Sequence, residues 1–310
     1  MSSTPSSGTV AVIILTYNEE ANIAHALSNV VGWADEVFVL DSMSSDGTLA
    51  IANKYECHVA QHLFEDYGKQ RNYALDTLPI RSEWVFFLDA DESLSPALKN
   101  EIASLIATVP VENGFFVKFR FMWMGRWIRR GYYPCWILRL LRPGKGRCED
   151  RSINEHLIVE GMTGYLSSDL VHEDRRGVGQ WITKHNAYAT GEARELIRVA
   201  SEPRLHELDA RLFGSQRERK RWIRHYIWNR LPPLARPFVY FTYRYLIAGG
   251  FLDGKAGLVY HFLQALWFQL LIDAKYLEIK RYQAVQRKPD HEAATREVTE
   301  SLRLQRSPPR

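Results

Sequence analysis

The chain has 310 residues, of which 46% are hydrophobic and 25% are charged, as in globular proteins. This length allows one large domain, or one domain with a sizeable appendage. The net charge of +4 is a mild excess, which by itself gives no reason to expect nucleic acid as a partner.

The cysteines and the N-terminus indicate a cytoplasmic protein. Cys57, Cys135 and Cys148 are odd in number and lack metal-ligand spacing, so we expect reduced thiols. Residues 1–9 lack the basic and apolar regions of a signal peptide and are expected to form a disordered tail. The most apolar long stretch, Leu258–Leu277, is interrupted by polar residues and is not expected to span a membrane.

Strand and helix patterns alternate in the first third of the chain. Val10–Leu15 is a continuous apolar run rich in β-branched residues, typical of a parallel strand that is buried on both faces. A helical stretch, Ala21–Val31, leads to a second such run at Val37–Leu40, and a third follows at Trp84–Leu88. This alternation predicts an open α/β sheet with right-handed crossovers.

The pattern changes after Pro110. Apolar and polar residues alternate through Phe115–Phe121, which predicts a strand of an exposed or mixed sheet. From about residue 180 the chain is predicted to be helical, most clearly over Glu192–Ala200 and Gly257–Lys280. We therefore expect an α/β domain over residues 10–190, a basic helical region over 191–284 and a polar tail over 285–310.

Asp89-Ala90-Asp91 directly follows the third apolar strand. Two carboxylates at a strand end can hold Mg²⁺ or Mn²⁺, which usually share their ligand shell with substrate phosphates. The alternative is that Asp91 or Ser93 caps the next helix, with Glu92 favourable at its N-terminus. Because Ser95 could cap that helix, this alternative leaves the aspartates unexplained.

Polar groups also follow the first two strands, at Thr16–Glu19 and Asp41–Asp46. In open α/β sheets ligands bind at the carboxyl ends of strands, so these groups point to one shared site. Lys69 and Arg71 add positive charge that suits a pyrophosphate, although spacing alone favours a solvated helix face.

Four motifs in this order resemble the family 2 glycosyltransferases, and more narrowly the branch containing lipopolysaccharide core β-1,4-glucosyltransferases. The resemblance covers Val10 to about Tyr188, and Gly249–Gly254 also looks like that branch. The motifs are Thr16-Tyr17-Asn18-Glu19-Glu20, Asp41-Ser42-Met43-Ser44-Ser45-Asp46-Gly47-Thr48, Gly68-Lys69-Gln70-Arg71-Asn72 and Asp89-Ala90-Asp91-Glu92.

This resemblance implies a GT-A fold and transfer of a sugar from a nucleotide donor with inversion. UDP-glucose is the first candidate from the branch, and heptose, galactose and N-acetylhexosamine donors stay open. The resemblance also implies that Asp91 binds the metal directly, that Asp89 lies nearer the ribose or a metal-bound water, and that His172 is a further ligand, although a lone histidine is more often structural. The residues implied at the donor are Thr16, Tyr17, Glu19, Asp41, Ser44, Lys69, Arg71, Asp89, Ala90 and Asp91.

Inversion needs a general base that deprotonates the acceptor hydroxyl. The resemblance favours Glu155 in Ile153-Asn154-Glu155-His156, where the branch usually has His-Glu, with Asp150 as the second candidate. The alternative for Glu155 is a surface carboxylate on a strand.

An aromatic cluster with arginines follows the alternating strand. Sugars stack on aromatic faces and phosphorylated acceptors favour arginine, so we assign the acceptor to Trp127, Tyr132, Trp136 and Arg139. The alternative is a partly buried hydrophobic flap. Farther on, Arg217–Trp228 mixes basic and aromatic residues, which suits an anionic membrane surface; RNA would suit it too, but the donor motifs argue against nucleic acid.

The sequence thus predicts an inverting, metal-assisted transferase that acts on a lipopolysaccharide core or another cell-envelope glycan. Its acceptor would be a glycolipid or lipid-linked saccharide, met in the cytoplasm or at the inner face of the cytoplasmic membrane. Two alternatives stay open: a polyprenyl-phosphate sugar transferase, which the lack of a spanning segment disfavours, and a nucleotide-sugar-binding protein without catalysis.

Overall fold

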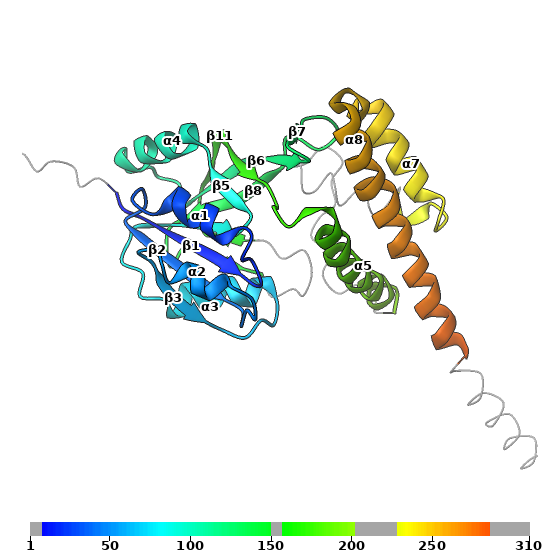
Figure 1. Ribbon diagram of the computed structural model, residues 1–310, viewed down its shortest axis with the longest axis horizontal. Helices are drawn as coiled ribbons and strands as arrows, with labels where there is room; N and C mark the ends of the chain where they lie inside the picture. The colour runs from blue at the N-terminus through cyan, green and yellow to red at the C-terminus, as the bar shows by residue number, and fades with distance from the viewer. Residues whose placement is uncertain (1–7, 150–156, 202–227, 286–310) are drawn as a thin grey trace, which may run out of the picture. The chain divides into compact units, whose positions relative to one another are not determined.

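The computed structural model describes residues 8–149, 157–201 and 228–285 (Figure 1). Both candidates for the general base, Asp150 and Glu155, lie outside these residues. So do most of the two expected tails and all but the end of the basic Arg217–Trp228 stretch.

The chain forms two compact units, and the first is discontinuous in sequence. It comprises Met1–Ile182 together with Tyr243–His261, while the second comprises Thr183–Thr242 and Phe262–Arg310. The expected boundary at residue 190 therefore falls inside the second unit, and a segment expected in the helical region belongs with the sheet.

The first unit is built on a mixed sheet of nine strands among the described residues, in the order β3-β2-β1-β4-β8-β6-β11-β5, with β7 paired to β6. Strands β1 to β4 run parallel, whereas β8 is antiparallel to both β4 and β6. The strands are β1 (Val10–Thr16), β2 (Glu36–Asp41), β3 (His58–Gln61), β4 (Trp84–Asp89), β5 (Glu92–Leu94), β6 (Gly114–Trp123), β7 (Arg126–Ile128), β8 (Trp136–Leu141) and β11 (Thr163–His172).

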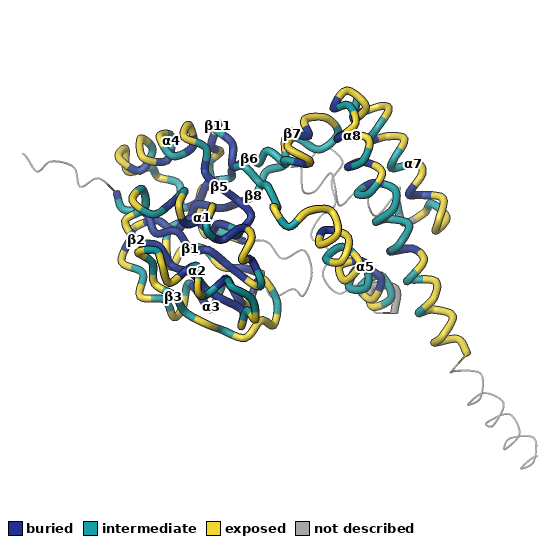
Figure 2. Tube along the Cα trace, viewed as in Figure 1, coloured by how far each residue is buried: buried dark blue, intermediate teal, exposed yellow. Residues whose placement is uncertain are grey.

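The three apolar strands are confirmed, and so is the strand predicted around Phe115–Phe121. All seven residues of β1 are buried, and Figure 2 shows β1 among the buried segments of the sheet. Strands β3 and β5 were not predicted because both are short. Strand β3 (His58–Gln61) has no buried residue, and β5 (Glu92–Leu94) begins with a glutamate.

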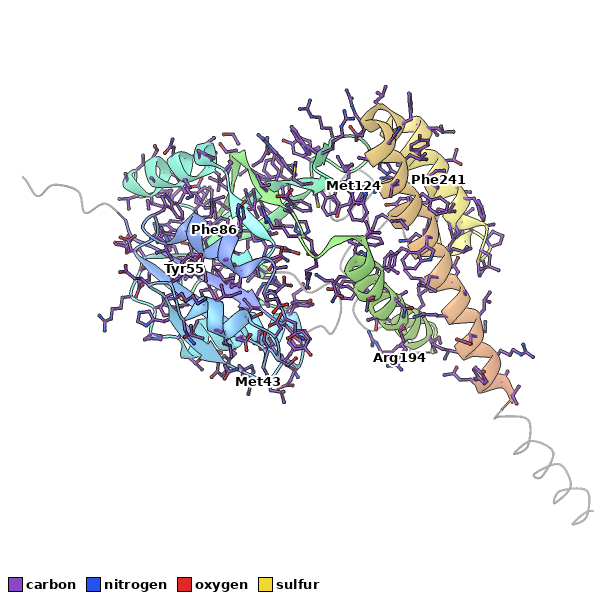
Figure 3. The ribbon with its side chains drawn as sticks, in the orientation of Figure 1. Met43, Tyr55, Phe86, Met124, Arg194 and Phe241 are labelled. Atoms are coloured by element: carbon purple, nitrogen blue, oxygen red, sulfur yellow. The ribbon has the colours of Figure 1, made fainter. Side chains whose placement is uncertain are left out.

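Helices cover both faces of this sheet, and an apolar cluster lies between the helices and the sheet on each face. Helices α1 (Ile23–Val30), α2 (Thr48–Ala52) and α4 (Pro96–Ala107) contribute to one apolar cluster, which includes Phe86, labelled in Figure 3. Helix α3 (Tyr67–Thr77) contributes Ala74 to the other cluster. A small second sheet of β9 (Gly146–Cys148) and β10 (Leu157–Val159) lies on the α3 side, since Cys148 and Leu157 belong to that cluster.

The cap of helix α4 decides between the two readings of the aspartate pair. The Ser95 Oγ accepts a hydrogen bond from the Leu98 backbone N–H at 3.2 Å, and Pro96 starts the helix. Ser95 is therefore the N-cap, and neither Asp91 nor Ser93 has that role.

The returning segment of the first unit, Tyr243–His261, packs on β6, on β7 and on the loop that follows β7. It contains the single turns η2 (Tyr243–Ile247) and η3 (Gly250–Asp253) and the helix α8 (Gly254–His261). The Asp253 Oδ2 accepts a hydrogen bond from the Arg130 backbone N–H at 2.8 Å, and the Tyr260 ring lies 4.8 Å from that of Phe121. A Cβ atom on Gly250 would lie 2.4 Å from the His261 ring, so this contact requires glycine.

The second unit is helical over residues 192–200, as predicted, and it holds the predicted helix over residues 257–280 except for residues 257–261, which belong to the first unit. It holds most of α5 (Gly177–Ser201), then η1 (Trp228–Arg230), α7 (Arg236–Thr242), the π-helical η4 (Phe262–Trp267) and a helical continuation over residues 268–285. A buried ion pair joins Arg236 to Asp273, with the Arg236 Nε donating to Oδ1 at 2.9 Å. Within the described ranges, we find no helix that combines the length and the apolar character needed to cross a bilayer.

Candidate functional site

The carboxyl ends of β1 and β2 form a dense hydrogen-bond network around Asp41. This carboxylate is 0% exposed. It accepts hydrogen bonds from the Thr16 hydroxyl at 3.0 Å, from the Ser44 hydroxyl and backbone N–H at 2.5 and 2.9 Å, and from the Gln61 amide at 3.0 Å. All of these donors are neutral. The buried Asp41 therefore fixes the positions of the loops that follow β1 and β2, and Thr16 and Ser44 are its hydrogen-bond partners.

The loops above Asp41 are tied together by their own polar groups. The Asn18 backbone N–H donates to the Ser44 Oγ at 2.8 Å, and the Asn18 Oδ1 accepts from the Ser45 backbone N–H at 2.8 Å. The ring of Tyr17 is 58% exposed, and Met43 is exposed in the loop after β2 (Figure 3). These two side chains are accessible to a planar ligand such as a nucleobase.

Glu19 faces inward, toward the loop after β11. Its carboxylate pairs with the Arg176 guanidinium at 2.8 Å and accepts a hydrogen bond from the Asn22 amide at 2.7 Å. Arg176 also pairs with Asp174 at 2.6 Å. Burial opposes the charge of Arg176, but Asp174, Glu19 and Asp91 outweigh it and raise the pKa of Arg176 above its usual value.

Asp89 is held by two guanidinium groups. The Arg139 Nη2 donates to the Asp89 Oδ2 at 2.6 Å and to the Glu92 Oε1 at 2.7 Å, and the Arg71 Nη2 lies 3.5 Å from the Asp89 Oδ1. Burial favours the neutral acid, yet Arg139 and Arg71 outweigh it and hold the pKa of Asp89 well below its usual value. Asp89 is thus an ionised, paired carboxylate, which fits a supporting role better than a direct metal bond.

This placement corrects the acceptor assignment of Arg139. The side chain is 6% exposed and its guanidinium is bound to two carboxylates, so it lies inside the sheet rather than on an acceptor surface. Glu92, considered above as a charge at the helix N-terminus, is instead the buried partner of Arg139.

Asp91 and His172 come together at the junction of β5 and β11. Asp91 is 6% exposed, and the His172 Nδ1 lies 3.6 Å from its Oδ1, beyond hydrogen-bond distance. The Asp91 carbonyl accepts a hydrogen bond from the Glu173 backbone N–H at 2.8 Å, which fixes the two chain segments side by side. The His172 ring stacks on Phe121 at 5.2 Å.

The donor set at this junction suits a divalent cation with oxygen and nitrogen ligands. Asp91 and His172 could supply one ligand each, and Mg²⁺ or Mn²⁺ commonly completes its shell with water and substrate phosphates. Among the described residues, no group of three or more histidine, cysteine, aspartate or glutamate side chains is arranged to hold a metal alone. A cation held by Asp91 and His172 would need its other ligands from water or from a phosphate-bearing ligand.

Helix α3 separates the two basic residues predicted at the diphosphate. The Lys69 Nζ pairs with Glu65 at 2.6 Å on the exposed side of the helix, where 49% of the lysine side chain is accessible. Arg71 points to Asp89 instead. Ala90 is buried in the turn after β4.

The predicted acceptor aromatics lie on opposite faces of the sheet. Tyr132 contacts Phe119, Phe121 and Tyr260 on the face that carries His172. Trp127 and Trp136 lie with Lys118 and Arg120, which alternate with Phe119 and Phe121 along β6 and so face the other way.

Three residues at this edge were not predicted. Asn22, Asp174 and Arg176 all bind other site residues directly. One signal was available, because Asp174-Arg175-Arg176 follows a strand end just as Asp41 and Asp89 do, but only His172 was assigned there.

The comparisons with known proteins agree with this architecture. A family model described as glycosyl transferase family 2 matches residues 11–169. The chain is 26% identical over 275 residues to the lipopolysaccharide core biosynthesis glycosyltransferase LpsC of Rhizobium meliloti, a match that covers 83% of this chain and 90% of that protein. It is 28% identical over 201 residues to an uncharacterized glycosyltransferase of Rickettsia conorii, covering 61% of this chain and 71% of the relative.

Two solved structures align with this chain at low sequence identity. The crystal structure of S. aureus TarS 1-349 aligns with a TM-score of 0.41 and 15% identity, covering 89% of this chain and 92% of that one. Glucosyl-3-phosphoglycerate synthase from Mycobacterium tuberculosis, solved with Mn²⁺, UDP and glucosyl-3-phosphoglycerate, aligns with a TM-score of 0.30 and 21% identity over 37% of this chain and 44% of that one.

The predicted fold is confirmed: the chain has the open mixed sheet of a GT-A fold, with helices on both faces and a helical C-terminal region. The family model spans the strands that end in Asp41 and Asp89 and the turn that carries Asp91. The chain belongs to glycosyl transferase family 2.

Proposed function

We propose that this family 2 glycosyltransferase is an inverting, metal-assisted enzyme that moves a hexose, with glucose from UDP-glucose as the first candidate, onto a lipopolysaccharide core or related cell-envelope glycan. The observation that carries this proposal is the junction of β4, β5 and β11. There a buried carboxylate, Asp91, faces His172, while Asp89 is kept ionised by Arg71 and Arg139.

The donor would lie along the carboxyl ends of β1, β2 and β4. The exposed Tyr17 ring and the rigid loop built on Asp41 and Ser44 suit the nucleoside, and Arg71 brings positive charge to the side where the diphosphate would lie. Because Lys69 is already paired with Glu65 on the outer side of α3, it is a weaker candidate for the diphosphate than Arg71.

Asp91 and His172 would hold a divalent cation, either Mn²⁺ or Mg²⁺. When bound, such a cation offsets the negative charge that grows on the departing diphosphate. The Asp89 carboxylate places a second negative charge close to Asp91. Its pairing with two arginines avoids an unpaired buried charge, which would cost several kcal/mol of stability.

The general base is proposed to be Glu155, with Asp150 as the second candidate. Both belong to the connection between β9 and β10, whose described ends, Cys148 and Leu157, pack on the α3 side of the sheet. A carboxylate from this connection would take the proton from the acceptor hydroxyl as its oxygen bonds to the anomeric carbon and the bond to the diphosphate breaks.

A cell-envelope acceptor is supported by similarity to LpsC over most of both chains. A cytoplasmic enzyme that meets a glycolipid at the inner membrane face would need a surface that tolerates lipid. The returning segment offers exposed apolar side chains at Leu246, Ile247, Phe251 and Leu252, next to the exposed Lys255.

A thermal-shift screen of nucleotide sugars with and without Mn²⁺, followed by a donor-hydrolysis assay, tests the proposal. A ligand that binds the folded state raises the melting temperature by mass action, so UDP-glucose with Mn²⁺ is expected to give the largest shift. Glu155→Gln should abolish transfer while the donor still binds, whereas Asp150→Asn should have the smaller effect. Donor binding without turnover in the wild-type protein would indicate a sugar-nucleotide-binding protein instead.

A further inference from the structure

One face of the sheet in the first unit carries cations held against aromatic rings. We call it the cation–aromatic face and define it by Lys118, Arg120, Trp127, Tyr133, Trp136 and Asp169. All six belong to strands β6, β7, β8 and β11 or to the loop that joins β7 to β8.

Register and alternation place this face opposite the proposed metal site. In the parallel pairing of β6 with β11, Phe121 lies beside His172 while Lys118 lies beside Asp169. Lys118 also pairs with Trp136 across the antiparallel β6–β8 ladder. Since neighbouring residues of a strand point to opposite faces, Lys118 and Arg120 point away from the face that holds Phe121 and His172.

Asp169 organises the cations of this face. It lies beside a bulge in β11, and its carboxylate accepts hydrogen bonds from the Arg120 Nε at 2.6 Å and the Tyr133 hydroxyl at 2.9 Å. The Lys118 Nζ lies 3.8 Å away. Only 7% of the Asp169 side chain is exposed, against 42% of the Arg120 side chain, so the carboxylate is covered and the cation is accessible.

The aromatic rings hold the cations in place. The Lys118 Nζ lies 5.6 Å from the Trp136 ring centre and 5.7 Å from that of Tyr133. The guanidinium carbons of Arg120 and Arg129 lie 4.7 and 4.5 Å from the Trp127 ring centre. Two cations, Lys118 and Arg120, therefore surround one buried carboxylate, and Arg129 adds a third positive charge over the Trp127 ring. The positive charge exceeds the negative charge beside these aromatic rings.

The positive charge and the aromatic rings together suit a ligand that has both an anionic group and a sugar ring. Aromatic rings pack against the C–H faces of sugars, and paired cations bind phosphate or carboxylate oxygens with charge-assisted hydrogen bonds. The exposed Tyr165 extends this surface, because its ring meets Trp136 at 5.0 Å. The connection that bears Asp150 and Glu155 starts and ends on the same side of the sheet, at Cys148 and Leu157.

We propose that the cation–aromatic face binds an anionic sugar residue of the acceptor, one that carries a phosphate or a carboxylate group. This inference rests on the proposed glycosyl transfer and assigns the chemical class of its acceptor. Lys118 and Arg120 would bind the anion, and Trp136 and Tyr165 would contact the sugar ring. Trp127 and Tyr133 would be positioning residues that hold the cations.

Titration of the full chain with four probes, by calorimetry or ligand-observed NMR, tests the proposal without any donor. Glucose 6-phosphate and glucuronic acid separate the two sources of charge, glucose lacks the charge, and inorganic phosphate lacks the ring. At least one anionic sugar should bind about ten-fold more tightly than glucose and than phosphate, the factor expected for one charge-assisted contact. Equal affinities for glucose and both anionic sugars, equally tight binding of phosphate alone, or no saturable binding would each overturn it.

Charge-removing variants locate the binding site. Arg120→Gln and Lys118→Gln should each weaken the preferred anionic sugar about ten-fold and leave glucose binding unchanged. Arg81→Gln removes an equal charge from an exposed site at the other end of the sheet and should change nothing. If Arg120→Gln lowers the melting temperature, Arg129→Gln keeps the ion pairs of Asp169 and should still weaken binding. Unchanged binding in Lys118→Gln, in Arg120→Gln and in Arg129→Gln, whose guanidinium lies over the Trp127 ring of the face, would overturn the assignment.

The same samples keep this inference separate from the proposed function. If UDP-glucose with Mn²⁺ fails to raise the melting temperature, the proposed donor is wrong whatever the sugar titrations show. If the donor binds and is turned over but anionic sugars gain nothing over glucose, the enzyme assignment stands and the acceptor class is wrong.

Discussion

Two aspartates end the strands on either side of β1, and their carboxylates have different kinds of partner. Asp41, at the end of β2, is surrounded by the neutral donors of Thr16, Ser44 and Gln61. Asp89, at the end of β4, is paired with the guanidinium groups of Arg139 and Arg71. The neutral hydrogen-bond donors around Asp41 orient its carboxylate and so fix the shape of the loop. The arginines around Asp89 offset its negative charge, and a bound divalent cation can change that balance.

Asp91→Asn tests the end of β4, where Asp89 and Asp91 lie, and should have the largest effect on activity. Asn keeps the size of the side chain but removes the charge that would hold a cation, so we expect at least a thousandfold loss of transfer, about 4 kcal/mol of transition-state stabilisation, with an unchanged melting temperature. Steady-state transfer rates and thermal melts check this. Asp76→Asn, at an exposed ion pair with Arg147, is the matched control and should keep full activity.

Arg139→Met should damage stability as well as activity. It leaves Asp89 and the buried Glu92 without their shared cation, and breaking such a pair costs roughly 3–5 kcal/mol of unfolding free energy, with the lower end expected because Asp89 is only half-buried. Urea denaturation measures the loss. Arg147→Met breaks an exposed pair and should hardly matter; equal losses in both variants would contradict the distinction.

Acid unfolding should show two pH ranges in which stability is lost, one set by the buried His261 and a lower one set by Asp89. Burial and the nearby Arg244 lower the pKa of His261 to about 4 from 6.5, so the unfolded chain binds the extra proton first. Stability is then complete above pH 6.5 and falls by roughly 3 kcal/mol as the pH drops toward 4. The lowered pKa of Asp89 acts below its usual value of 3.8, where protonation of the unfolded chain removes the stabilisation from Arg139.

Chemical denaturation between pH 2 and 8 resolves the two windows. His261→Gln should flatten the upper window alone, and Asp89→Asn should flatten part of the lower one. A single transition that neither variant alters would contradict both assignments.

Thr16→Val tests the neutral end and should have the smallest effect. It removes one of the hydrogen bonds to Asp41 while keeping the shape of the side chain, which costs about 1 kcal/mol of unfolding free energy. Thr77→Val removes an exposed hydroxyl bond to the Tyr73 carbonyl and serves as the control. A loss for Thr16→Val as large as that for Arg139→Met would erase the difference between the two strand ends.

The positions of the strand ends were predictable, but their partners were not. Short apolar runs rich in Val, Phe and Leu are typical of buried parallel strands and placed Asp41 and Asp89 at strand ends. The carboxyl ends of parallel strands meet at one edge of the sheet. Arg139 lies 50 residues from Asp89, in a strand whose pairing depends on the whole sheet, so no local pattern revealed the contact. Lys69 and Arg71 show the same limit, since helix α3 turns one to solvent and the other to Asp89.

The return of Tyr243–His261 to the first unit has a consequence for protein synthesis. The ribosome must complete residues 183–242 before it supplies Asp253, which binds the Arg130 backbone, and Tyr260, which packs on Phe121. Domains generally fold as units during translation, N-terminal parts first, and this one cannot finish in that order. The nascent chain therefore presents the aromatic side chains around Phe121 and Trp123 to the folding machinery of the cell until its last third emerges.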